Sequence, residues 1–177
     1  MKKALIAAAI GLLLCTAIQA EVKKKIILDL EKGMPNDFSN CDLEIIPAVD
    51  AQSPTYLKII PKPGEVLVGM MRPRVKIWDG YDLIKFDYIN EGKTPLEWVI
   101  IIYPQSGNYH TRADLKFVCR PGKGTVELEI AGINSNFSGP MDWKKPVDKW
   151  HFYGPLAGPL QIGSVTLETK EEEKPKK

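Results

Sequence analysis

Hydrophobic and charged positions alternate along the middle of the chain. In residues 81–89, Ile84, Phe86 and Tyr88 fall on one face of an extended segment, with charged residues between them. Successive side chains of a β-strand point to opposite faces, so a period of two predicts a strand with one buried face. Residues 125–130 repeat the pattern, which indicates a second strand of the same kind.

Short apolar segments separated by Gly, Pro, Asn and Asp continue through most of the sequence, with almost no helical periodicity. Residues 96–103 are apolar on both faces, which is typical of a central strand. Strands without crossover helices pair antiparallel, so we expect one all-β domain over 21–169, a two-sheet β-sandwich of about nine strands. The predicted strands lie at 26–30, 43–46, 56–60, 81–89, 96–103, 115–119, 125–130, 147–153 and 160–167, and residues 66–71 are a further candidate.

Residues 1–20 have the layout of a secretory signal peptide, with two lysines before an apolar run over 4–14. The run is too short to cross a bilayer, which takes about 20 residues. We expect cleavage after Ala20 and a secreted or periplasmic protein; cleavage after Ala17 is the alternative. Cys15 would also permit a lipoprotein, although the residue before it is larger than lipid-modifying processing accepts.

The charge of the mature chain is balanced. The full sequence has 24 Lys and Arg against 22 Asp and Glu, and two of the lysines belong to the predicted signal peptide. A nucleic-acid-binding protein would carry a basic excess, so we expect no nucleic-acid partner. No other apolar run approaches membrane-spanning length, so no membrane span is expected in the mature chain. Residues 170–177 contain only Lys, Glu and Pro and are predicted to be a disordered tail.

Two cysteines, Cys41 and Cys119, remain after the predicted cleavage. In an oxidising compartment an even number of cysteines indicates a disulfide. It would close a loop of roughly 80 residues and contribute about 4 kcal/mol if the constraint on the unfolded chain dominates. Two buried free thiols are the alternative. We expect the Cys41–Cys119 disulfide.

One block of the sequence carries a resemblance to a known family. A W-x-G-Y-D motif at 78–82 leads into a strand that ends at Asn90. Further motifs follow the same order as in galactose-binding-like jelly-roll modules, and together they resemble that family over nearly all of the mature chain. The resemblance implies an antiparallel two-sheet jelly roll, commonly a carbohydrate-binding module. The further motifs lie at 28–31, 108–112, 121–128 and 163–167.

The resemblance also implies a structural calcium between the first and last strands. Asp29 and Glu31 would be its oxygen ligands, but calcium takes about six to eight oxygens. The family usually has an acidic residue where this chain has Ser164, and this departure weakens the case for the metal. We expect no other cofactor.

A sugar-binding face requires flat aromatic rings against sugar C–H groups and planar polar groups that bind paired hydroxyls. On a β-sandwich these come from the outward face of one sheet and from neighbouring loops, where the alternative is an ordinary solvated surface with cross-strand ion pairs. Trp78 and Trp98 are expected to be structural. The predicted ligand-binding residues are Asp87, Tyr103, Tyr109, Arg112, Glu127, Trp143 and His151.

Catalytic chemistry finds little support in the sequence. It has two histidines, no Gly-x-Ser-x-Gly motif, no zinc-ligand spacing and no Gly-rich phosphate loop. Glu127 and Glu129 would lie about 7 Å apart on one face of a strand, a spacing compatible with glycoside hydrolysis but common on exposed strands.

We predict a non-catalytic protein that binds a glycan or polysaccharide. The alternatives are a structural or protein-interaction module on the same fold and, with less support, a small glycan-active enzyme.

Overall fold

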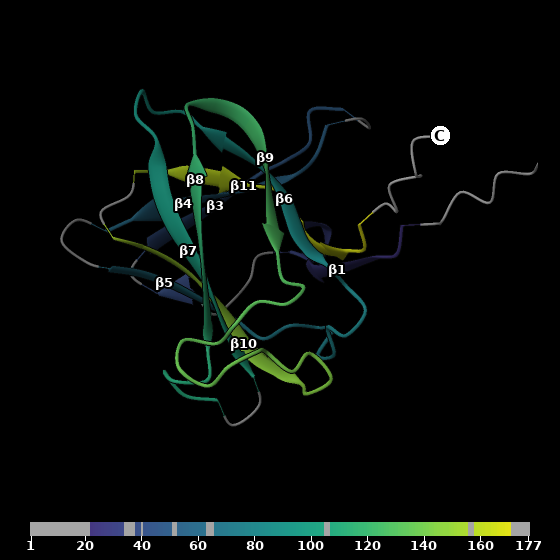
Figure 1. Cartoon of the computed structure of the whole chain (residues 1–177). Helices are drawn as coiled ribbons and strands as arrows, with labels where there is room; N and C mark the ends of the chain where they lie inside the picture. The colour runs from purple at the N-terminus through teal and green to yellow at the C-terminus, as the bar shows by residue number, and fades with distance from the viewer. Residues whose placement is uncertain are drawn as a thin grey trace, which may run out of the picture.

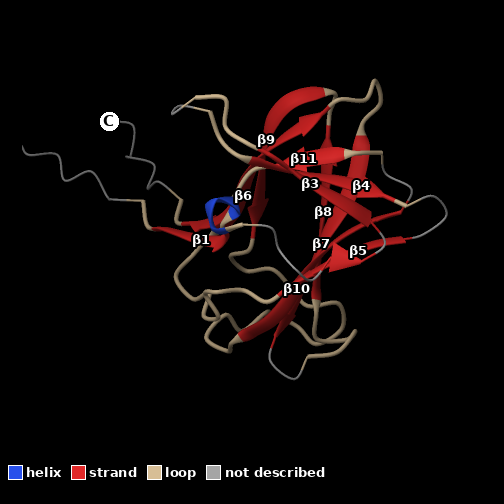
Figure 2. Ribbon diagram, turned by 180° about the vertical axis from the view of Figure 1, so that it is seen from behind, coloured by secondary structure: helices blue, strands red, loops and turns tan. Residues whose placement is uncertain are grey.

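The alternating segments of the sequence form strands that pair only antiparallel, in two sheets that face each other (Figure 1). The computed structural model describes residues 22–33, 38–39, 41–50, 53–62, 66–104, 107–155 and 158–170. Within these ranges the only helix is a single 3-10 turn, η1 (Leu30–Lys32), next to the first strand (Figure 2). The predicted all-β, antiparallel two-sheet jelly-roll sandwich is confirmed.

The larger sheet is built around β6, the strand whose alternation is clearest in the sequence. β6 pairs with β9 along its whole length, and on its other side it meets β12 near its start and β11 near its end. The sheet has seven strands, namely β1 (Lys24–Leu28), β3 (Cys41–Ile46), β4 (Tyr56–Pro61), β6 (Leu83–Asn90), β9 (Gly122–Glu129), β11 (Leu160–Ile162) and β12 (Val165–Glu168).

The smaller sheet has five strands in the order β2-β5-β10-β7-β8. β7 lies between β10 and β8, so its backbone is paired on both sides, in agreement with its apolar sequence. The strands are β2 (Phe38–Ser39), β5 (Val66–Met71), β7 (Leu96–Pro104), β8 (Ala113–Cys119) and β10 (Val147–Pro155).

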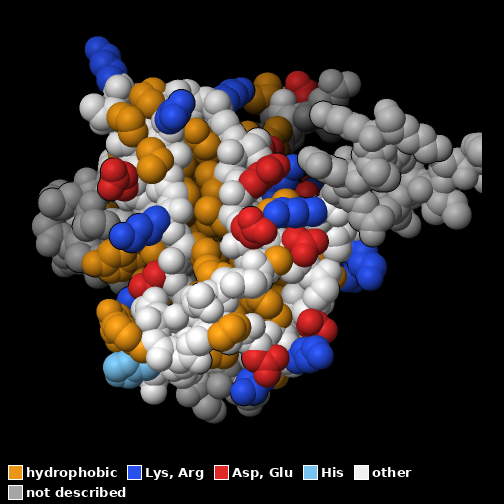
Figure 3. Space-filling model, in the orientation of Figure 1, with side chains coloured by type: hydrophobic (Ala, Val, Ile, Leu, Met, Phe, Trp, Pro, Cys, Tyr) orange, Lys and Arg blue, Asp and Glu red, His pale blue; other side chains and the backbone are white. Residues whose placement is uncertain are grey.

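Aromatic side chains from both sheets meet in the core. Phe86 of the seven-stranded sheet packs edge to face against Phe117 and Phe152 of the five-stranded sheet, with ring centroids 5.5 and 5.7 Å apart. Trp98 and Trp150 are also buried, as is the structural Trp78. On the open side of the sandwich, hydrophobic side chains run in a strip between β8 and β9 (Figure 3).

The described residues contain twelve strands rather than about nine. The predicted strand at 160–167 is divided into β11 and β12, which lie one after the other along the same edge of β6. The break falls at Gly163 and Ser164, where the Gly163 N–H donates to the Asp87 carbonyl at 2.8 Å. β9 begins at Gly122, three residues before the predicted strand at 125–130, and β2 lies outside every predicted strand.

The predicted disulfide is absent from the structure, in which both Cys41 and Cys119 are free. Cys41 opens β3 in one sheet and Cys119 ends β8 in the other, and an even cysteine count alone does not determine which strand ends meet. Burial raises the pKa of the Cys119 thiol to about 12, and burial also raises the pKa of Cys41. Both thiols are therefore poor nucleophiles at neutral pH.

Two other predictions concern the ends of the chain. The predicted signal peptide and residues 171–177 of the predicted tail lie outside the described residues. Lys170 is described: its backbone N–H donates to Asp82 at 2.8 Å and its ammonium group pairs with Glu129 at 2.7 Å. In the described part of the chain no helix is long and apolar enough to cross a membrane.

The packing around Trp98 provides a test of the core. A Cβ atom added at Gly154 would lie 2.8 Å from Trp98 Cδ2, whereas one added at Gly158 would lie 3.6 Å from Leu96 Cδ2. We expect Gly154→Ala to lower the free energy of unfolding by about 1–3 kcal/mol in urea denaturation, through overpacking. Gly158→Ala is the matched control, because both changes restrict the unfolded chain equally. Equal stabilities of the two variants would contradict the packing described here.

Candidate functional site

The outer face of the five-stranded sheet carries the polar and aromatic residues that the sequence analysis singled out on β7 and β10. Trp98, Ile100 and Ile102 point into the core, so Tyr103 points outward. The strand register places Tyr103 opposite Lys149 of β10. One pair further along, Ile101 lies between His151 of β10 and Asp114 of β8.

Arg112 and Asp114 form the central polar contact of this face. Arg112 Nη2 donates to Asp114 Oδ2 at 2.9 Å, and Nε lies 2.8 Å from Oδ1 in the same ion pair. Arg112 Nη1 lies 3.0 Å from the Tyr103 hydroxyl in a further hydrogen bond. Partial burial opposes the charge of Arg112, but its hydrogen bonds to Asp114 and Tyr103 raise its pKa above the ordinary value. The guanidinium group is therefore charged and fixed in position.

One exposed ring lies against the guanidinium group, and a second exposed ring lies beside the first. Arg112 Cζ lies 4.4 Å from the Tyr109 ring centroid, in a cation–π contact. The Phe137 ring is 5.8 Å from that of Tyr109, tilted by 39°. Tyr109 is 52% exposed and Phe137 is 68% exposed, although both are large apolar rings. We call Tyr103, Tyr109, Arg112, Asp114, Phe137 and His151 the outer-face cluster.

Asn136 holds the loop that carries Phe137 against the loop that carries Tyr109. Its backbone N–H donates to the Arg112 carbonyl at 2.8 Å, and its side-chain amide donates to Asp114 Oδ2 at 3.3 Å. The Phe137 N–H donates to the His110 carbonyl at 3.0 Å. These contacts between segments more than 20 residues apart in sequence fix the two rings side by side.

His151 contributes a neutral ring to the cluster. Its centroid lies 5.2 Å from that of Tyr103. Burial lowers the pKa of His151 to about 4, with further contributions from the positive charges of Lys149 and Arg112. The imidazole is therefore uncharged over the physiological pH range.

The structure brings together four of the predicted ligand-binding residues: Tyr103, Tyr109, Arg112 and His151. The other three lie elsewhere.

Asp87 and Glu127 belong to β6 and β9 of the other sheet, where Asp87 accepts a hydrogen bond from Thr125 at 2.7 Å and Glu127 pairs with Lys85 at 2.7 Å. Acidic and basic side chains gather over these two strands in Figure 3.

Trp143 stacks on Trp78, with centroids 5.7 Å apart, and donates its indole N–H to the Ile130 carbonyl at 2.8 Å. It is half-buried against the core.

Two residues of the cluster were missed in the sequence. Asp114 follows Arg112 by two positions and alternates with the buried Ala113 and Leu115, so its outward direction could have been read from the strand pattern. Phe137 is an isolated aromatic residue in a loop of small and polar residues, which is a signal of an exposed ring. Nothing in the sequence indicated that the two loops touch.

The residues expected to hold calcium do not fit that ion. Asp29 caps η1, accepting from the Glu31 N–H at 3.2 Å through Oδ1. Its other oxygen lies 3.2 Å from Lys32 Nζ and 3.6 Å from Arg74 Nη1, so two cations already neutralise it. Within the described ranges no three His, Cys, Asp or Glu side chains converge to hold a metal ion.

Comparison with known proteins places the fold among carbohydrate-binding modules. No protein-family model and no curated protein sequence matches the chain. Among solved structures, a mutant of a family 29 carbohydrate-binding module is similar with a TM-score of 0.53 and 16% identity, over 84% of this chain and 93% of that one. A mutant from the same family complexed with cellulohexaose has the same score and identity, over 85% and 93%.

A family 11 carbohydrate-binding module from Clostridium thermocellum, in complex with a β-1,3-1,4-mixed-linked tetrasaccharide, has a TM-score of 0.58 and 13% identity. The similarity covers 85% of this chain and 98% of that module. At this identity the likeness establishes the fold. The resemblance to carbohydrate-binding-module-like β-sandwiches found in the sequence is therefore confirmed at the level of fold.

The depressed pKa of His151 has a consequence for stability. The unfolded chain takes up a proton at this residue near pH 6.5, whereas the folded chain does so only near pH 4. The unfolded state thus binds more protons between these values, and stability falls as the pH is lowered. Between about pH 7 and about pH 4.5, we expect the free energy of unfolding of the wild type to fall by about 1–3 kcal/mol more than that of His151→Phe, measured by urea denaturation. Parallel pH profiles for the variant and the wild type would contradict this.

Proposed function

We propose that this chain is an exported, non-catalytic protein that binds a glycan or polysaccharide through the outer-face cluster. The observation that carries the proposal is the pair of exposed rings, Tyr109 and Phe137, beside the fixed guanidinium of Arg112. Monomeric proteins seldom hold neighbouring large apolar rings in water without a partner for them. Such rings can pack against the C–H faces of sugars.

The polar groups of the cluster complement hydroxyl groups. A guanidinium has five N–H donors, and the contacts of Arg112 with Asp114 and Tyr103 engage Nε and both Nη atoms. Each Nη retains a second N–H that can donate to a sugar hydroxyl. The Tyr103 hydroxyl accepts from Arg112, which leaves its own O–H free to donate to a sugar oxygen at the same place.

Rigidity favours binding by this face. Asp114 holds Arg112 from the side, and Asn136 ties the two ring-bearing loops together. Less conformational freedom is lost when a ligand meets groups that are already fixed, so weak individual contacts can suffice for affinity.

The non-catalytic part of the proposal rests on the carboxylates of β9. Glu127 pairs with Lys85 and Glu129 with Lys170, each at 2.7 Å, and all four side chains are substantially exposed. Carboxylates that are exposed and held in ion pairs on an open strand do not form the enclosed pair of carboxyl groups that flanks the bond in glycoside hydrolysis. Export is proposed from the layout of residues 1–20, with a secreted or periplasmic destination.

The ligands seen with similar folds supply probes for a test. Cellulohexaose and a β-1,3-1,4-mixed-linked tetrasaccharide are the named ligands of two similar structures. We expect the mature protein, residues 21–177, to bind at least one glycan class on an array that includes these oligosaccharides. Tyr109→Ala and Phe137→Ala should each raise the dissociation constant about tenfold or more, and a tenfold rise corresponds to about 1.4 kcal/mol of binding free energy.

Glu127→Gln is the matched control, because Glu127 was an equally good candidate in the sequence but lies on the other sheet. It should bind as the wild type does. A blank array with folded protein would instead favour the protein-interaction function. Equal weakening by Glu127→Gln and Tyr109→Ala would contradict the location proposed for the site.

A further inference from the structure

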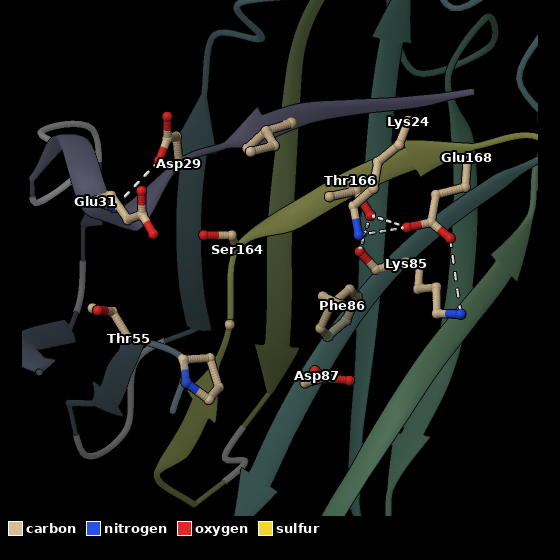
Figure 4. A pocket seen from close by; sticks show the side chains of 13 residues that line it. Lys24, Asp29, Glu31, Thr55, Lys85, Phe86, Asp87, Ser164, Thr166 and Glu168 are labelled. Carbon is tan, nitrogen blue, oxygen red and sulfur yellow. Dashed lines mark hydrogen bonds and ion pairs between the residues drawn. The ribbon is translucent and has the colours of Figure 1, made fainter. Parts of the chain in front are cut away.

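An open pocket of about 290 Å³ lies on the seven-stranded sheet, away from the outer-face cluster. It is formed by β1, the β11–β12 connection, β6 and the residues just before β4 (Figure 4). Figure 4 shows Glu31, Thr55 and Ser164 arranged around one opening, with Phe86 and Asp87 of β6 beside it.

The strand register explains why there is a pocket here. β12 pairs with β6 at residues 83–85, and β11 pairs with it at Tyr88 and Ile89. Between these stretches Phe86 and Asp87 have no strand partner on that side, and only the Gly163 N–H reaches the Asp87 carbonyl. The sheet therefore has a gap at Phe86 on this edge of β6. The Phe86 side chain lines the pocket and also belongs to the core.

One end of the pocket is occupied by its own ion pairs. Glu168 lies 2.9 Å from Lys24 Nζ and 3.8 Å from Lys85 Nζ, and it accepts a hydrogen bond from Thr166 at 3.1 Å. Burial opposes the charge of Glu168, but these partners lower its pKa below the ordinary value. This end is fixed and its charges are balanced.

The other end keeps polar atoms without partners. In the described part of the chain, neither the Glu31 carboxylate nor the Thr55 hydroxyl makes a hydrogen bond or ion pair, and Asp87 engages only Oδ1, with Thr125. Ser164 Oγ accepts from the Leu30 N–H at 3.3 Å, which leaves its own O–H free to donate. The Glu31 carboxylate and the hydroxyls of Ser164 and Thr55 thus lie around one opening, with Asp87 further along the pocket on β6.

An apolar wall faces these polar atoms. Ile26 and Pro54 line the pocket and are exposed, and the buried Phe86 contributes to its floor. A concave site with an apolar wall and a few convergent polar groups is the usual form of a small-ligand site. Its volume is near the lower limit of such sites, about 300 Å³, so a single ring would fill it.

We propose that this pocket is a second ligand site, which takes one polyhydroxylated ring such as a monosaccharide or the terminal sugar of a chain. The Glu31 carboxylate would accept from hydroxyl groups of the ring, and Thr55 and Ser164 would donate to them. Ile26 and Pro54 would cover the apolar side of the ring. The site is separate from the outer-face cluster, and neither site depends on the other.

The test is a backbone-amide NMR titration of the full mature chain with D-glucose, D-galactose and D-mannose, each to about 10 mM, where a site of millimolar affinity is mostly filled. At least one sugar should shift the amides of Thr55, Gly163 and Ser164 in a saturable way. Thr55→Val, which removes the hydroxyl at nearly constant volume, should weaken this response by about fivefold or more.

Thr94→Val is the matched control, since it makes the same chemical change at an exposed position outside the pocket. It should titrate as the wild type does, and so should Tyr109→Ala, whatever that variant does to glycan binding. Three results would overturn the proposal: no saturable shift at the pocket with any of the sugars, an undiminished response in Thr55→Val, or shifts confined to the outer-face cluster.

Discussion

The contact of Phe86 with Phe117 and Phe152 is the interaction on which the rest of the molecule depends. It joins the centres of the two sheets through edge-to-face ring contacts at 5.5 and 5.7 Å. Because side chains alternate along a strand, burying Phe86 turns Lys85 and Asp87 outward, and burying Phe152 turns His151 outward. The core thereby decides which residues are available to a ligand on each sheet.

This dependence explains what could be predicted from the sequence. The alternation of β6 and β9 indicated the correct inward and outward positions, because a period of two is a local property. The order of strands within the sheets is not local. For this reason Asp87 and Tyr103 were grouped as one candidate face although they lie on different sheets. The expected bond between Cys41 and Cys119 failed for the same reason.

The loops show the same limit at the site itself. Tyr109 and Arg112 were recognised from residue type, but their use depends on Asn136 and Phe137, which reach them through hydrogen bonds between distant segments. Trp143 was counted among the predicted ligand-binding residues, whereas the structure stacks it on Trp78. Residue type suggests which groups could bind a sugar, and tertiary contacts decide which of them are presented together.

The outer-face cluster and the pocket differ in ways that follow from their positions. The cluster lies on paired strands and tied loops, so it presents an open surface along which an extended chain could lie. The pocket arises where β6 lacks a partner, so it is small and limited to the gap beside Phe86 and Asp87. A protein with both would hold a polymer on one sheet and a single ring on the other.

The most direct test of the central claim is to observe where an oligosaccharide touches the protein. Intermolecular nuclear Overhauser effects would be recorded between a bound β-1,3-1,4-mixed-linked tetrasaccharide or cellulohexaose and the aromatic protons of the mature chain. Binding through the outer-face cluster requires contacts from sugar C–H protons to the rings of Tyr109 and Phe137. Contacts confined to residues of β6 and β9, with none to these two rings, would contradict it.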